Sequence, residues 1–404
     1  MLIPETKYAR IDDVNIAYQV TGSGEEYLIF IPGWCSNVEE VWNIPQLAAW
    51  LQCLGTFSKL VLFDKRGTGL SDRVNEHDLP DLEQRVKDLQ ALMNAIGIKK
   101  ATLLGLSEGG AMALMFAHRY PQQVSQLILF GSFAKWIKSE DYPFGLTREK
   151  HDRIKQYIFD NWGKPVGLPL MAPSVKDDIT AQNQWATFLR RSGSPAAARA
   201  LYEMNLQIDV IQILNKIKTP TLIMHRKNDS LIECGHSQYL YKKMPNAQLL
   251  ITEGIDHLPW FNVQREEIAA IQTFLISGKA VTKKMEILNV EDIYTLYAIR
   301  NYILHHFRES FSIKSLSKQF GINVFKMKRG FRILFDSSVI GFLTHTRLDM
   351  ACKLLGNPNE TIASIADQVG YGYPNNFSLA FKRKYGITPQ QYKTNIDKSM
   401  MKAL

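Results

Sequence analysis

The hydrophobic pattern of this chain changes in kind near Ser277, and that change limits the fold more than any other feature. Up to this point short β-rich runs alternate with helical patterns, as expected for βα units around a mostly parallel sheet. Beyond it every segment has the three- and four-residue spacing of helices. At 404 residues the chain is also long for one domain. We therefore predict an α/β domain over 1–277, a small, basic linker over 278–288 and an all-α domain over 289–404.

Six apolar runs in the first domain have the length and composition of strands. They are Tyr27–Ile31, Lys59–Phe63, Ala101–Leu104, Leu127–Phe130, Thr221–His225 and Ala247–Ile251. The last five are almost continuously apolar, which predicts strands buried on both faces of a sheet. The strand pattern lapses over about 133–216, where helical spacing and bulky apolar groups predict a helical cap over the carboxyl edge of the sheet.

The third of these runs leads into the pattern Gly-x-Ser-x-Gly, which covers residues 105–109 and centres on Ser107. A helical pattern over 110–119 follows, so the serine lies in the strand–turn–helix context of a nucleophile elbow. The two glycines suit such a turn because its backbone is strained and larger side chains would clash with the strand and helix beside it. We predict that Ser107 is a nucleophile; the alternative is a structural serine in a glycine-rich turn.

Two partners for this serine follow later predicted strands. Asp229 comes shortly after the fifth strand and His257 after the sixth. In a catalytic triad the histidine takes the proton of the serine, and the aspartate orients the imidazole and stabilises its cation. Asp256 is an alternative acid, but adjacent side chains on a loop seldom face each other. We expect His225 to be a packed strand residue and His236 a surface helix residue.

The order Ser, Asp, His is that of the α/β-hydrolases, which the first domain resembles. DKRGTGLS over 64–71 resembles the family's D-x-R-G-x-G-x-S loop, and IPGW over 31–34 resembles its H-G-x oxyanion loop, with Pro32 in place of the usual histidine. The resemblance implies that the backbone N–H groups of Trp34 and Glu108 face the oxyanion, each contributing about 3 kcal/mol. Pro32 removes neither donor, but it leaves open what supports the loop.

The loops over 31–33 and 64–72 also resemble those of hydrolase domains attached to nucleotide cyclases and other regulators, which favours sensing over metabolism. We expect Asp64, Arg66 and Asp72 to fix their loop through ion pairs. The aromatic residues of the cap either form a simple core or line a pocket for a small, largely apolar acyl ligand.

The helical domain contains two helix-turn-helix patterns in tandem. In the second, a short helix from Ile362 ends at Gly370, a residue that suits a tight turn because it tolerates positive φ. A longer helix over Asn375–Tyr385 follows, and Gly386 ends it.

The first helix-turn-helix pattern covers Ile313–Phe335. Gly321 marks its turn, and Asn323 is a good N-cap for a basic second helix over Val324–Leu334. A long helix over Ile340–Leu355 connects the two patterns.

Together the two patterns resemble the DNA-binding domain of the AraC/XylS family of transcription regulators, over about 105 residues. The second half matches specifically, as I-x2-IA-x3-GY, F-x3-FK and YG-x2-P-x2-Y between Ile362 and Tyr392. The first half matches more loosely. Asp336 stands where glycine is usual, which questions the helix end there, and Leu379 stands where arginine is common, which implies an altered base preference.

The resemblance implies that two recognition helices enter successive major grooves of double-stranded DNA. The residues expected to contact bases, grooves or phosphates are Phe325, Lys328, Arg329, Asn375, Asn376, Ser378, Lys382 and Arg383. The charge distribution favours the same partner. Residues 285–404 hold 16 Lys and Arg against 9 Asp and Glu, whereas residues 1–284 hold 32 against 30. An ordinary basic surface would explain the charge equally well, but not the motifs.

Other features of the sequence exclude several classes. The four cysteines are scattered without metal-ligand spacing, and we expect neither disulfides, metal nor cofactor. No apolar run approaches the length of a membrane span, and residues 1–10 lack the apolar core of a signal peptide, so we expect a cytoplasmic protein without a membrane partner.

Three functions fit these observations. The first is a sequence-specific transcription regulator whose hydrolase-like domain senses an acyl ligand; RNA polymerase is then a further partner to consider. The second is a serine esterase or lactonase whose DNA-binding tail is a tether. The third combines them, with slow hydrolysis removing the inducer. The sequence leaves open the ligand, the operator, the sign of regulation and the oligomeric state.

Overall fold

The computed structural model describes residues 3–75, 80–276, 290–335, 337–357 and 360–394, and it divides into two compact units. The first unit covers Met1–Glu286 and the second Ile287–Leu404. The expected linker over 278–288 lies outside the described residues, and so does Asp336. None of the described helices is both long and apolar enough to cross a membrane.

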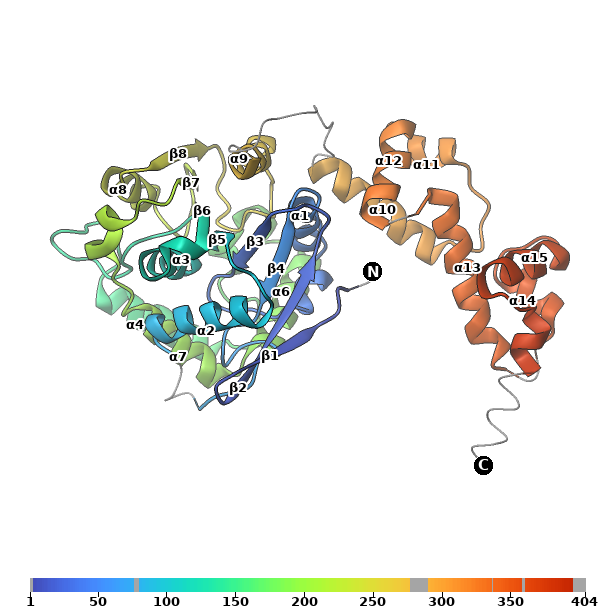
Figure 1. Cartoon of the computed structure of the whole chain (residues 1–404), viewed down its shortest axis with the longest axis horizontal. Helices are drawn as coiled ribbons and strands as arrows, with labels where there is room; N and C mark the ends of the chain where they lie inside the picture. Colours follow the sequence, from blue (N-terminus) through green and yellow to red (C-terminus); the bar gives the residue numbers. More distant parts are fainter. Residues whose placement is uncertain (1–2, 76–79, 277–289, 336, 358–359, 395–404) are drawn as a thin grey trace. The chain divides into compact units, whose positions relative to one another are not determined.

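The first unit is built on an eight-stranded sheet with the strand order β1-β2-β4-β3-β5-β6-β7-β8 (Figure 1). The six strands β4, β3, β5, β6, β7 and β8, in this spatial order, all pair in parallel with their neighbours. Strand β2 pairs antiparallel with both β1 and β4. The strands are β1 (Lys7–Ile11), β2 (Val14–Thr21), β3 (Tyr27–Ile31), β4 (Lys59–Phe63), β5 (Ala101–Leu106), β6 (Val124–Phe130), β7 (Thr221–Arg226) and β8 (Ala247–Thr252).

All six predicted strands are present, so the predicted α/β class is confirmed. The hairpin of β1 and β2 was not predicted, because polar residues such as Arg10, Asn15 and Gln19 interrupt its apolar runs. The expectation that the last five strands are buried on both faces is wrong for β8. This strand lies at the edge of the sheet and only its last residue, Thr252, is buried.

Helices surround the sheet and supply the apolar layers that bury it. Outside the segment between β6 and β7 they are α1 (Pro45–Gly55), α2 (Leu82–Ala95), α3 (Glu108–Arg119), α8 (Gly235–Lys243) and α9 (Arg265–Ile276), with short 3₁₀ turns η1 (Glu40–Asn43) and η3 (Pro121–Gln123). The segment between β6 and β7 contains α4 (Arg148–Asp160), α5 (Leu168–Met171), η4 (Pro173–Val175), α6 (Ile179–Ser192), α7 (Pro195–Asn205) and η5 (Ile211–Lys216). This helical segment is called the cap below.

The second unit is all helical, as predicted. Its helices are α10 (Val290–His305), α11 (Ile313–Gln319), α12 (Val324–Phe335), α13 (Val339–Leu355), α14 (Ile362–Gln368) and α15 (Pro374–Tyr385). Helices α11 and α12 form the first helix-turn-helix and α14 and α15 the second (Figure 1). At the second turn Gly370 has φ +83°, and a Cβ there would lie 2.6 Å from the carbonyl oxygen of Arg308, so the position requires glycine.

Candidate active site and nucleic-acid interface

Ser107 occupies the sharp turn between β5 and α3. Its φ of 57° and ψ of −126° are strained for a residue other than glycine. The turn is tightly enclosed, because a Cβ at Gly109 would lie 2.3 Å from the carbonyl oxygen of Ile31 and one at Gly105 would lie 2.6 Å from that of Gly109. The geometry is therefore that of a nucleophile elbow, in which the serine is presented at the end of its strand.

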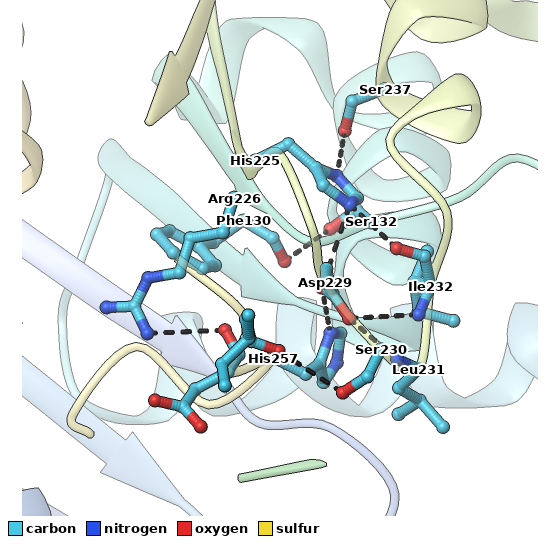
Figure 2. Close-up of polar contacts among 12 residues, drawn as sticks. Phe130, Ser132, His225, Arg226, Asp229, Ser230, Leu231, Ile232, Ser237 and His257 are labelled. Atoms are coloured by element: carbon cyan, nitrogen blue, oxygen red, sulfur yellow. Dashed lines mark hydrogen bonds and ion pairs between the residues drawn. The ribbon is translucent and has the colours of Figure 1, made fainter. Parts of the chain in front are cut away.

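Asp229 and His257 are brought together at the carboxyl ends of β7 and β8, as Figure 2 shows. His257 Nδ1 lies 2.7 Å from Asp229 Oδ2, and the other oxygen of Asp229 accepts the N–H groups of Leu231 and Ile232 at 2.9 and 3.0 Å. Because an ionised carboxylate can only accept, Nδ1 carries the proton and Nε2 has a free lone pair. Within the described residues no hydrogen bond reaches that Nε2. This is the tautomer that a general base needs.

A second histidine lies on the far side of the aspartate. His225 Nε2 is 3.6 Å from Asp229 Oδ2 and donates to the carbonyl oxygen of Ile232 at 2.8 Å, while Nδ1 lies 2.7 Å from Ser237 Oγ (Figure 2). Burial lowers the pKa of His225 and favours its neutral form. Burial alone would raise the pKa of Asp229, but the charge and hydrogen bond of His257, with His225 beside it, bring that pKa below its ordinary value. The aspartate is thus held ionised.

The loop that carries His257 is fastened by a buried arginine. The guanidinium of Arg226 forms two bonds with the Glu267 carboxylate, at 2.8 and 2.9 Å. Its remaining donors reach five carbonyl oxygens of the loop, those of Asp256, Leu258, Pro259, Phe261 and Asn262. Both charged side chains are almost fully buried, so the pair is anchored in a region of low dielectric.

The expected oxyanion loop runs directly beside Ser107. A Cβ on Gly33 would lie 3.5 Å from the Cβ of Ser107. Trp34 follows in this loop, and Glu108 is the first residue of α3, whose N–H has no acceptor inside the helix. Both expected donors therefore belong to segments that border the serine. Lys65, which the sequence did not single out, lies at this loop with its Nζ 2.6 Å from the carbonyl oxygen of Gly33.

A cavity of about 340 Å³ opens beside these residues, and its lining includes Ser107, Glu108, Trp34 and His257. This volume is at the small end of the range for ligand sites. The remaining walls are mostly apolar and come from both the sheet and the cap. The aromatic groups of the lining include Trp34, Trp136, Trp185, Phe188, Tyr202 and Trp260.

The cap is bonded to both loops of the site. The carbonyl oxygen of Met171, at the end of α5, accepts the N–H groups of His257 and Leu258 at 2.8 and 3.1 Å. On the other side, the indole of Trp34 donates to the carbonyl oxygen of Ala198 at 3.3 Å and packs edge-on against Trp162. Any shift of the cap therefore acts on the histidine loop and on the oxyanion loop.

The contacts of Asp256 and His236 bear on two other expectations. Asp256 does not meet His257; its carboxylate accepts from Ser174 N and from Asn262 Nδ2, each at 3.0 Å. His236 is not a surface residue, which corrects that prediction. It is 2% exposed, and its Nδ1 lies 2.7 Å from Tyr142 Oη, because the chain after β6 folds over α8.

The loop over 64–72 is fixed only partly by ion pairs. Arg66 pairs with Asp88 at 2.7 Å, as expected for a loop-fixing cation. Asp64 and Asp72 instead accept backbone N–H groups, Asp64 from two residues and Asp72 from Asn15 at 2.8 Å. Burial raises the pKa of Asp64 to about 6.

Gly131 borders the candidate triad, although nothing in the sequence singled it out. It follows β6 with φ +54°, and a Cβ there would lie 2.8 Å from His257 Cε1 and 3.4 Å from Asp229 Oδ2. Only its place in the sheet beside β7 brings it to these side chains. No local sequence signal could have identified it.

We predict that Gly131→Ala displaces the imidazole and reduces reaction at Ser107 by about 100-fold, the scale of a misplacement of about 1 Å. The rate of fluorophosphonate labelling measures this effect. Gly163→Ala, at another glycine of positive φ where the nearest atom is 3.7 Å away, is the control for backbone strain. Equal labelling rates for the two variants would contradict the prediction.

The second unit presents its predicted DNA-contacting residues on α12 and α15. The apolar sides of these helices are buried through Met327 and Phe331 on α12 and Phe377 and Phe381 on α15. The opposite sides carry the predicted contacts. Phe325, Lys328, Asn375, Asn376, Lys382 and Arg383 are exposed, while Arg329 and Ser378 are half-buried.

The caps of these helices agree with the sequence prediction. Asn323 Oδ1 accepts the N–H of Phe325 at 2.7 Å, and Gly386 ends α15 with φ +78°. The start of α12 and the end of α15 are therefore each fixed by a capping residue.

We predict different effects for two exposed residues of α15. Lys382→Ala should weaken binding about equally for all DNA sequences and reduce the salt slope by about one, as for the loss of one phosphate contact. Asn376→Ala should cost about 1–3 kcal/mol only on sequences that hold its preferred base. Titrations of labelled DNA at several salt concentrations measure both. Lys353→Ala, an exposed lysine of α13, is the control; the prediction fails if it matches Lys382→Ala.

The fold and the site together define an α/β-hydrolase unit joined to a helix-turn-helix unit. Comparison with known families agrees: a family model described as serine aminopeptidase, S33 matches residues 28–264, and the chain belongs to this family of α/β-hydrolases. A second family model, described as a helix-turn-helix domain, matches residues 316–395 and is of the AraC type. The chain thus carries a DNA-binding domain fused to a hydrolase domain, as both resemblances implied.

Individual proteins similar to this chain match its hydrolase unit. Serine hydrolase BPHL from Homo sapiens is 28% identical over 254 residues, which cover 61% of this chain and 79% of that protein. Karrikin insensitive 2 receptor B from Petunia hybrida is 24% identical over 247 residues, covering 59% of this chain and 87% of the receptor. The solved structure of an esterase from Exiguobacterium antarcticum matches with a TM-score of 0.55 at 21% identity, covering 66% of this chain and 96% of that one.

Proposed function

We propose that this protein is a transcription regulator whose hydrolase unit binds a small, largely apolar acyl compound at Ser107. The observation that carries the proposal is the apolar cavity of about 340 Å³ that Ser107 and His257 line, in a chain whose other unit is a DNA-binding domain. Apolar walls with a few convergent polar groups are typical of small-molecule sites. The similarity to a protein named as a receptor supports a sensing role for such a unit.

The cap connects the ligand cavity to two loops of the hydrolase unit. Part of the cavity wall belongs to the cap, which is bonded to the His257 and Trp34 loops through Met171 and Ala198. A ligand that fills the cavity contacts both loops and the cap at once. Such a ligand changes DNA binding only if its affinity differs between the DNA-bound protein and the free protein.

The test measures DNA affinity with and without ligand. Operator fragments are first selected from genomic DNA by the purified protein, and a panel of small esters and lactones is then screened by thermal shift. Compounds that raise the melting temperature should change the affinity for the selected DNA by about 5- to 150-fold. The proposal would be contradicted by ligands that bind without changing the affinity for DNA. DNA binding that does not depend on the DNA sequence would also contradict it.

A working serine hydrolase is the second candidate, and a specific observation favours it. Ser107 occupies a strained elbow, and the Asp229–His257 pair holds the tautomer of a general base. The two functions combine if slow hydrolysis removes the inducer. In that case Ser107→Ala prolongs the transcriptional response to a pulse of ligand, whereas an unchanged time course excludes the combination.

A further inference from the structure

Lys65 and Glu108 form a buried ion pair beside the oxyanion loop. Lys65 lies just after β4, and Glu108 is the first residue of α3. Their Nζ and Oε1 atoms are 3.4 Å apart, and the two side chains are only 2% and 4% exposed. A buried pair contributes little to stability compared with apolar residues of the same size, so its presence beside a reactive serine requires another explanation.

The lysine is bonded mainly to backbone carbonyls. Its Nζ lies 2.6 Å from the oxygen of Gly33 and 3.4 Å from those of Pro32 and Trp34. An ammonium group has three donors and no acceptor, so it suits a cluster of oxygens. These carbonyls belong to three successive residues, and the last of them carries one of the two expected oxyanion donors.

We propose that Lys65 is a positioning residue, whose ammonium gathers the carbonyls of residues 32–34 and so holds the Trp34 N–H toward the oxyanion. The inference rests on the proposed reaction of Ser107 with an acyl group. It answers the question raised by Pro32, which has no polar side chain to support this loop. Support comes instead from the end of the neighbouring strand β4, where Lys65 lies.

Lys65 also balances the negative charge of Glu108 near the expected oxyanion. The Glu108 carboxylate belongs to the residue after the nucleophile and lines the same cavity as Ser107. Unpaired, its negative charge would oppose the oxyanion that forms there, because electrostatic effects are strong where water is excluded. Lys65 offsets this charge while it binds the loop. The histidine loop is held in the same way, by Arg226 paired with Glu267.

Two measurements on the full-length protein separate these roles. The rate of fluorophosphonate labelling at Ser107 reports the oxyanion site, and hydrogen–deuterium exchange over residues 32–38 reports the loop directly, without any reaction. Lys65→Met should slow labelling by about 10- to 100-fold and speed exchange in this loop. Lys59→Met is the matched control, since Lys59 is an exposed lysine at the other end of β4; it should change neither quantity.

The double variant Lys65→Met/Glu108→Gln decides between positioning and simple charge balance. It removes both charges of the Lys65–Glu108 pair together, so neither partner is left buried alone, and it should fold even where the single variant does not. Positioning predicts that the loop still exchanges fast and that labelling stays at least about 10-fold slow. If the double variant regains the labelling rate and the exchange of the unaltered protein, the proposal is overturned.

A pH profile supplies an independent readout. Burial lowers the pKa of Lys65 to about 8, although Glu108 opposes this shift. The other groups that act on it are Arg85, whose pKa burial lowers to about 10, and Cys35, whose pKa burial raises to about 12. Labelling should therefore fall as the pH rises through about 8 and Lys65 loses its charge. A fall that persists unchanged in Lys65→Met would contradict the proposal.

Failure of the inference is distinguishable from failure of the proposed function. If the unaltered protein is not labelled at all, the proposed chemistry of Ser107 fails, and exchange over residues 32–38 still decides whether Lys65 holds the loop. Unchanged exchange in both Lys65→Met and the double variant would overturn the positioning role even if labelling is fast.

Discussion

Ser107→Ala is expected to abolish fluorophosphonate labelling and to reduce any acyl hydrolysis by at least about 10⁴-fold, as found when the members of a serine triad act as a unit. The strained turn between β5 and α3 presents the Ser107 hydroxyl beside the cavity. The Nε2 lone pair of His257 is available to accept the proton of this hydroxyl. DNA binding in the absence of ligand should be unchanged, because the recognition helices belong to the other compact unit.

A matched variant makes this result specific. Ser139→Ala removes a serine whose hydroxyl bonds to Asp141 in the exposed start of the cap, and it should label normally. Labelling that survives in Ser107→Ala, located by mass spectrometry of the modified peptide, would show that another residue reacts. The proposed nucleophile would then be wrong, although the fold would be unaffected.

Arg226→Met is expected to have the largest effect on stability, lowering the free energy of unfolding of the hydrolase unit by about 3–5 kcal/mol. The substitution leaves Glu267 buried without its ionic partner and removes the donors that bind five carbonyl oxygens of the His257 loop. Urea denaturation followed by tryptophan fluorescence measures the change. The unit holds several buried tryptophans, including Trp50 and Trp260.

Two variants test the cause of this loss. Lys227→Met alters the next residue, whose pair with Glu253 is exposed, and should leave the midpoint of unfolding nearly unchanged. Arg226→Met/Glu267→Leu removes both buried charges and should recover part of the stability without restoring labelling of Ser107, because the histidine loop stays unfastened. A double variant that labels normally would show that Arg226 does not position His257.

Much of the fold could be predicted because its signals are local. The six apolar runs, the elbow around Ser107 and the glycines Gly321, Gly370 and Gly386 of the helix-turn-helix units each depend on residues within one short segment. The hairpin of β1 and β2 was missed, since polar residues divide both strands into very short apolar runs. Burial of His236 was also missed, because it depends on Tyr142, which is 94 residues away in the chain.

The sequence by itself determined the two classes of domain, the triad candidates Ser107, Asp229 and His257, and the helices expected to face DNA, because turn chemistry and hydrophobic period act over a few residues. Only the tertiary structure decided what holds the site in place. Lys65 and Arg226 are unremarkable cations in the sequence, and they become supports for two loops only where sheet pairing and burial bring distant carbonyl oxygens around each charge. A buried charge must be satisfied by whatever the fold places beside it, and no local pattern records that requirement.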